Sequence, residues 1–151
     1  MNKYSYSSIM MKNVVYKTYF DLTTDEFKNK FEDFRRLCNQ KGLNSMGPIT
    51  YVITQIDLQG KCNMEIYMPV DRAIRPSEEL NYRTYFCMSM MLQGRIKTNR
   101  FIEEEIELLE DMNEFAKEKN LTFISSYFHT LRTNYNDEKA WIDVKARIYE
   151  N

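Results

Sequence analysis

The stretch Met64-Glu65-Ile66-Tyr67-Met68-Pro69-Val70 alternates apolar and polar side chains and closes on a proline and a valine. Successive side chains of a β-strand point to opposite faces, so this pattern predicts a strand with Met64, Ile66 and Met68 on one apolar face. Pro69 cannot donate a backbone hydrogen bond to a neighbouring strand, and it therefore predicts the end or the edge of this strand.

A second stretch, residues 142–148, repeats the pattern 78 residues further on (142 − 64). Its apolar face consists of Ile142, Val144, Ala146 and Ile148. The same offset relates Gly42 to Asn120, which both stand where a helix is expected to end, because these residue types adopt left-handed backbone at low cost. We therefore predict two copies of a strand-helix-strand-strand unit, over about residues 14–70 and 82–150, joined by a linker over about residues 71–81.

Two helices are predicted from apolar stripes at helical spacing. The first begins with Thr23 and Glu26, which fit a capping box. Its stripe comprises Phe27, Phe31, Phe34 and Cys38. The stripe of the second helix comprises Ile102, Ile106, Leu109, Met112 and Ala116, and it is widened by Phe101, Leu108 and Phe115. The offset preserves apolar character at most of these positions but fails at Phe27, which maps to Glu105, so a single α+β domain with a chance match remains the alternative.

Strand formers surround each helix. The first strand of each unit is expected over residues 14–20 and 82–91 respectively. Residues 1–12 are either a lead-in or part of a long first strand. The strand over residues 82–91 is expected to break at Gly94. Hairpins are expected from residues 49–56 with 62–68, and from residues 121–131 with 141–149, the latter with a turn at Asn134, Asn136 and Asp137.

Neither unit can bury its apolar sheet face and helix stripe alone. We therefore predict an α+β fold, in which the two units form one antiparallel sheet with both helices on one face. The groove between the helices, floored by the sheet, is the predicted concave site.

Composition restricts the class of protein. The chain has 151 residues, 43% hydrophobic and 28% charged, and a formal net charge of -1 without a basic block. This predicts one globular domain that binds no nucleic acid, because phosphate binding needs clustered Lys and Arg. No apolar run is long enough to span a membrane, and the N-terminus lacks the apolar segment of a signal peptide. Three cysteines without a CxxC pair favour a reduced, cytoplasmic protein.

The strand-helix-strand-strand order taken twice, with the first unit closing on residues 64–70, resembles the GyrI-like domains. These are effector-binding modules of bacterial transcription regulators that also occur as stand-alone proteins. The resemblance implies a ligand-binding groove. Multidrug-binding members place an acidic residue in the pocket from the last strand, whereas here Asp143 lies on the face opposite Val144, which argues against a cationic ligand. The second unit also carries Arg147 where the proline would stand. A weaker resemblance links the chain to small Gram-positive proteins encoded near type VII secretion toxins.

The predicted ligand-binding residues follow from the offset and the alternation. They share the helix-facing side of the two hairpins: Tyr51, Met64, Ile66, Tyr127, His129 and Val144. A hydrogen-bonded structural role is the competing interpretation for His129, the single histidine. One histidine and scattered cysteines provide no metal-ligand spacing, and Cys38, Cys62 and Cys87 lack the positions that activate a thiolate. We predict no metal, no cofactor and no catalytic residue.

Three functions are compatible with these features. The first is a non-enzymatic binding protein for a small apolar or aromatic molecule or a partner segment. The second is a protein–protein adaptor, chaperone or immunity factor associated with type VII secretion, for which a homodimer is possible. The third is a small hydrolase of GyrI-like type, which would need an acid or hydroxyl such as Glu65, Tyr67 or Tyr16 in the groove.

Overall fold

A computed structural model of the chain describes residues 4–97, 101–132 and 141–151. Its described part contains seven strands, which pair antiparallel, and two α-helices, so the predicted α+β class is confirmed. The elements follow one another as β1 (Ser5–Leu22), a short 3-10 turn (Thr24–Glu26), α1 (Phe27–Gln40), β2 (Thr50–Ile56), β3 (Cys62–Pro69), β4 (Asn81–Ile96), α2 (Phe101–Glu118), β5 (Leu121–Phe123), β6 (Phe128–Leu131) and β7 (Ile142–Glu150). The turn predicted at Asn134, Asn136 and Asp137 lies outside the described residues.

The chain forms two compact units. We call Met10–Cys87 the first unit, and Met1–Ile9 together with Met88–Asn151 the second unit. The long strands β1 and β4 contribute residues to both. β1 contains two residues with left-handed backbone, Asn13 at φ 54° and Asp21 at φ 55°, and β4 contains one, Met90 at φ 57°. Non-glycine residues rarely adopt this conformation, so each of them marks a local irregularity. Of the two possibilities for residues 1–12, the structure shows the long first strand from Ser5 onward.

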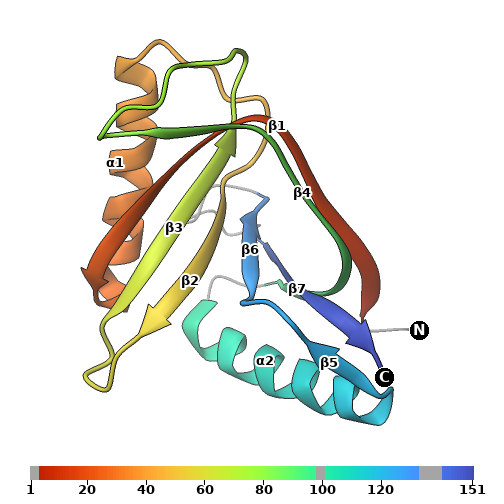
Figure 1. The fold of residues 1–151 in the computed structure, drawn as a ribbon. Coiled ribbons are helices and arrows are strands. Elements are labelled where there is room, and N and C mark those ends of the chain that lie inside the picture. The colour runs from red at the N-terminus through yellow and green to blue at the C-terminus, as the bar shows by residue number, and fades with distance from the viewer. Residues whose placement is uncertain (1–3, 98–100, 133–140) are drawn as a thin grey trace. The chain divides into compact units, whose positions relative to one another are not determined.

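In the first unit, β4, β1, β3 and β2 are neighbours in that order, and α1 runs along them (Figure 1). The apolar face predicted for β3 is buried, since Met64 and Ile66 have 0% exposed surface. Pro69 is the last residue of β3 and pairs with Val14, as expected for a residue that ends a strand. The side chains that α1 buries are Phe31, Phe34 and Cys38.

The helix ends also follow their predicted chemistry. The capping box is present at the start of α1: the Glu26 carboxylate accepts a hydrogen bond from the backbone N–H of Thr23, 3.1 Å away, and one from the Thr23 hydroxyl. These bonds hold the pKa of Glu26 below its ordinary value. Beyond the helices, Gly42 has φ 69° and Asn120 has φ 56°, so both adopt the left-handed conformation that terminates a helix.

In the second unit, β7 pairs with β6, β5 and β4. The predicted hairpin of residues 121–131 with 141–149 is interrupted, because residues 124–127 separate β5 from β6. The prediction that Gly94 breaks its strand is wrong: Gly94 lies within β4 and pairs with Val144. A Cβ there would come 2.8 Å from Leu108 Cδ1 and 3.1 Å from Tyr4 Cε1, so the glycine serves close packing of α2.

The buried stripe of α2 differs from its prediction at one described position. Leu108, Met112 and Ala116 are buried as expected, but Ile106 is 58% exposed. Among the described residues, no helix is long and apolar enough to cross a membrane.

The two hairpins have the same strand register at the offset of 78 residues. Tyr51 pairs with Ile66, and His129 pairs with Val144. One step along, Ile53 pairs with Met64 and Leu131 with Ile142. Cross-strand pairs share one face of a sheet, so each pair presents its side chains on the same side.

Candidate functional site

The six predicted ligand-binding residues fall into two sets, one in each unit. Tyr51, Met64 and Ile66 belong to the first unit, and Tyr127, His129 and Val144 to the second. Met64, Ile66 and Val144 have no exposed surface, Tyr51 is 5% exposed and His129 is 2% exposed. The strand residues are therefore part of each unit's core. Helix side chains that cover them determine whether a ligand could contact them.

In the first unit, two phenylalanines of α1 cover Tyr51. The Phe31 ring centroid lies 5.0 Å from that of Tyr51, and the half-buried Phe27 approaches edge-on at 6.3 Å. At these separations a pair of aromatic rings contributes stabilising free energy in addition to that from burying its apolar area. The pair Phe27–Tyr51 therefore joins the helix surface to the buried sheet through an aromatic contact.

In the second unit, a carboxylate of α2 covers His129. Glu105 Oε1 is hydrogen-bonded to His129 Nε2, and the Glu105 side chain is 31% exposed. This contact agrees with the structural interpretation of His129. Sequence reasoning treated Glu105 only as a position where the repeat fails, yet the offset of 78 residues could have indicated this contact. It relates Phe27 to Glu105 and Tyr51 to His129, so a contact in one unit predicts a contact in the other.

Tyr127 lies between β5 and β6 rather than in a strand. Its hydroxyl donates to Asn113 Oδ1 at 3.1 Å, and its ring lies 5.4 Å from that of Phe123. Burial raises the pKa of the Tyr127 hydroxyl. The structure thus brings His129 and Val144 together across one strand pair and places Tyr127 beside α2.

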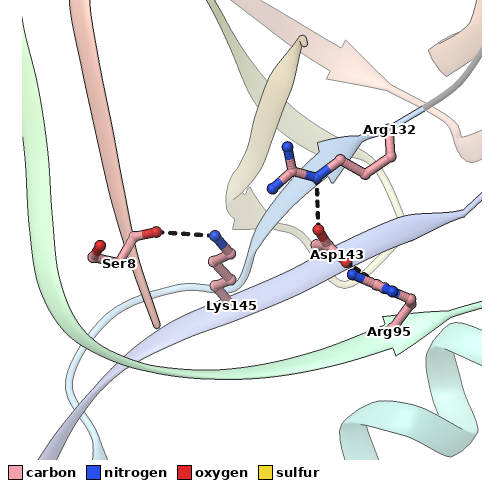
Figure 2. A network of polar contacts seen from close by, with 5 residues as sticks. All are labelled: Ser8, Arg95, Arg132, Asp143 and Lys145. Atoms are coloured by element: carbon pink, nitrogen blue, oxygen red, sulfur yellow. Dashed lines mark hydrogen bonds and ion pairs between the residues drawn. The ribbon is translucent and has the colours of Figure 1, made fainter. Parts of the chain in front are cut away.

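A polar network occupies the opposite face of β7, and sequence reasoning missed it. The carboxylate of Asp143, which is 1% exposed, lies between two arginines (Figure 2). Arg95 Nε donates to Asp143 Oδ1 and Arg132 Nε donates to Oδ2, both at 2.7 Å. We call Ser8, Arg95, Arg132, Asp143 and Lys145 the Asp143 network.

Lys145 is the third cation of this network. Its ammonium is nearly buried and donates to the backbone carbonyl of Ser8 at 2.9 Å. Burial lowers the pKa of Lys145, the positive charge of Arg132 lowers it further, and Asp143 acts in the opposite direction. Burying a charge costs free energy unless the charge is paired or hydrogen-bonded. The surrounding strands must therefore hold the charged groups of this network and their hydrogen-bond partners together.

The cysteines show no sign of activation. Cys38 and Cys62 are buried and Cys87 is exposed. Burial raises the pKa of Cys38 to about 11 and also raises the pKa of Cys62, which disfavours the reactive thiolate. Within the described residues, no group of three His, Cys, Asp or Glu side chains is placed to hold a metal ion.

Comparisons with known proteins agree with this fold. The sequence matches the family described as "Domain of unknown function (DUF5085)" over residues 10–150. Among the curated proteins, none is similar enough in sequence to count as a relative.

Solved structures show similar folds at low identity. The crystal structure of the EcmrR C-terminal domain has a TM-score of 0.70 and 9% identity, with 98% of this chain and 99% of that one covered. EcmrR in a cryo-EM complex with DNA has a TM-score of 0.76 and 8% identity, with 99% of this chain covered, which spans only 59% of that protein. An uncharacterized conserved protein from Listeria innocua has a TM-score of 0.57 and 9% identity, covering 95% of this chain and 91% of that chain. At these identities the likeness shows the fold alone.

Proposed function

We propose that this chain, which belongs to the DUF5085 family, is a non-enzymatic binding protein for a small apolar or aromatic molecule or a short partner segment. The observation that carries the proposal is the pair of helix-to-strand contacts, Phe27 on Tyr51 and Glu105 on His129. In each contact a partly exposed helix residue lies on a buried strand residue. On the helix-facing side of the first unit a ligand would meet an aromatic edge. On the helix-facing side of the second unit it would meet a carboxylate–imidazole pair.

The two-copy organisation belongs to the same proposal, with copies over about residues 14–70 and 82–150. The equal register of the two hairpins and the equal placement of Gly42 and Asn120 support it. Duplication leaves two equivalent positions that can diverge, so each unit can bind a chemically different group at its own contact. The groove predicted between the helices stays a prediction.

The experiment titrates the full chain with an uncharged aromatic probe, N-phenyl-1-naphthylamine, and follows its fluorescence. We expect Tyr51→Ala to reduce the free energy of probe binding by more than it reduces the free energy of unfolding. Because Tyr51 is buried, the milder Phe27→Leu carries the same test with less loss of core packing.

The matched control is Tyr85→Leu, since Tyr85 is 60% exposed and lies on β4 away from α1's contacts with Tyr51. We expect Phe27→Leu to reduce probe affinity about tenfold, which corresponds to ~1.4 kcal/mol, and the control to leave it unchanged. Equal affinities for the wild type, Phe27→Leu and Tyr51→Ala would remove these residues from the site.

The adaptor function, with its link to type VII secretion, remains the second candidate. The observation that favours it is the exposure of apolar side chains near the β2–β3 turn, where Ile56 is 70% exposed and Leu58 is fully exposed. Affinity purification of the tagged full chain from crosslinked cells, compared with Leu58→Ser, tests it. Loss of a co-purifying protein in the variant would support an adaptor.

The hydrolase alternative receives no support from the residues named for it. Tyr16 stacks on Tyr67 at 5.4 Å, and Glu65 accepts a hydrogen bond from Thr18 at 3.0 Å. The Thr18–Glu65 contact joins a hydroxyl to a carboxylate, as covalent hydrolysis needs, but Glu65 lies on the face of β3 opposite Met64 and Ile66 and therefore does not face the predicted groove.

A further inference from the structure

The two arginines of the Asp143 network use only a small part of their hydrogen-bonding capacity. A guanidinium carries five N–H donors, and each of these arginines is bonded to Asp143 through Nε. Within the described part of the chain, the terminal nitrogens of Arg95 and Arg132 have no further acceptor. Their side chains are 44% and 38% exposed, so these donors are open to solvent while the carboxylate that holds them is buried.

The network also holds more positive than negative charge. Asp143 provides one carboxylate, whereas Arg95, Arg132 and the ammonium of Lys145 provide three cations. One arginine would be enough to pair with a buried aspartate. Among the described residues, no second carboxylate is bonded to this cluster, so the second arginine adds charge that an anion from solution would neutralise.

The strand framework fixes the two guanidinium groups before any ligand arrives. Arg95 on β4 lies directly opposite Asp143 on β7, and Arg132 follows β6, the strand on the other side of β7. The backbone N–H of Arg132 donates to the carbonyl of Trp141 at 3.1 Å, and the Arg95 guanidinium lies 5.6 Å from the centre of the Trp141 ring. Figure 2 shows both arginines pointing toward Asp143 from opposite sides. Such prior ordering lowers the entropic cost of binding.

The first unit shows that the fold does not need this charge. Glu65 stands where Asp143 does in the other hairpin, and its partner is the hydroxyl of Thr18. Thr54, the position that corresponds to Arg132, donates only to the carbonyl of Asn63 at 3.4 Å. The cationic cluster is therefore a feature of the second unit alone, in addition to the common framework.

We propose that the guanidinium groups of Arg95 and Arg132, held in place by Asp143, form a binding site for an oxyanion, either a carboxylate or a phosphate group of a small molecule. Planar guanidinium groups bind both oxyanions through paired N–H donors, which a lysine ammonium cannot do. This site lies on the face of β7 opposite His129 and Val144, so it is distinct from the helix-facing site proposed above and does not depend on it.

The test uses the full chain at constant ionic strength in chloride, titrated separately with inorganic phosphate and with succinate by calorimetry. The guanidinium Nε–Hε signals of ¹⁵N-arginine-labelled protein are followed in parallel. We expect saturable binding of at least one probe, with shifts of the Arg95 and Arg132 signals. The stronger probe identifies the source of the oxyanion.

The decisive variant is the double substitution Arg95→Lys with Arg132→Lys, which keeps two positive charges beside Asp143 but removes the planar donors. We expect its affinity for the preferred probe to fall at least about tenfold. The matched control is Arg36→Lys on α1, where the exposed Arg36 pairs with Asp33 at 3.0 Å, and its affinity should be unchanged.

Three results would overturn the proposal: absence of saturable binding of either probe, undiminished binding by the double variant, or an equal loss in Arg36→Lys. If the double variant fails to fold, the single variant Arg132→Lys and the signal shifts of the wild type decide the question. The uncharged aromatic probe should bind the double variant as it binds the wild type, so the two proposals can fail separately.

Discussion

In the first unit the ring of Phe27 covers Tyr51, whereas in the second unit the carboxylate of Glu105 covers His129, at positions that correspond along the chain. The strand partners beneath them, Ile66 and Val144, are apolar and fully buried in both cases. The sheet framework is thus the same in both hairpins, while the helix contact is aromatic in one and polar in the other.

The opposite sheet face shows the same contrast. In the first unit Tyr67 packs against Phe86 at 4.9 Å, and in the second unit the corresponding Lys145 donates to Ser8. Alternation of apolar residues is enough to form the strands, so the intervening positions are free to change their chemistry. Binding properties can therefore differ between two units of the same construction.

The largest effect is expected from removing the carboxylates at corresponding positions. Asp143→Ala leaves two arginines and Lys145 close together without a counter-charge, and we expect a loss of about 3 kcal/mol in the free energy of unfolding. Glu65→Ala removes a half-buried carboxylate bonded to a hydroxyl, and we expect a loss below about 1 kcal/mol. Urea unfolding measures both. Equal losses would show that the charged network contributes no more than its uncharged counterpart.

A smaller effect is expected at the helix contacts. Phe27→Ala removes a half-buried ring that packs on Tyr51, at an expected cost of about 2 kcal/mol. Glu105→Ala removes one hydrogen bond to a buried imidazole, at an expected cost of about 1 kcal/mol. Thermal and urea unfolding of the two variants give this order, and a larger loss for Glu105→Ala would reverse our view of which contact is mainly structural.

The smallest effect concerns pH. The pKa of Lys145 is lowered in the folded state, so the unfolded chain binds this proton more tightly. The contribution of Lys145 to stability must then rise with pH, from the folded pKa up to the ordinary value of 10.5. We expect the stability of the wild type, measured relative to Lys145→Met, to increase across this range. The other groups that titrate there cancel in the difference, and a flat or falling difference would contradict burial as the cause.

The elements of the fold could be predicted because they depend on local pattern. Alternation around Met64 and Ile66 indicated a half-buried strand, Thr23 with Glu26 indicated a helix start, and Gly42 with Asn120 indicated helix ends. Each signal reflects steric or hydrogen-bonding preferences within a few residues. The strand break predicted at Gly94 was wrong because a glycine that permits close helix packing looks the same in sequence as one that breaks a strand.

The sequence by itself determined the α+β class and the pairing of apolar strand faces, because burial follows the periodicity of side chains along one strand. Only the tertiary structure decided which polar groups meet. Arg95 precedes Asp143 by 48 residues and Arg132 precedes it by 11, and no spacing rule links the three until the pairing of β4, β6 and β7 brings them onto one face. Contacts of this kind depend on strand register across the sheet, which local pattern does not specify.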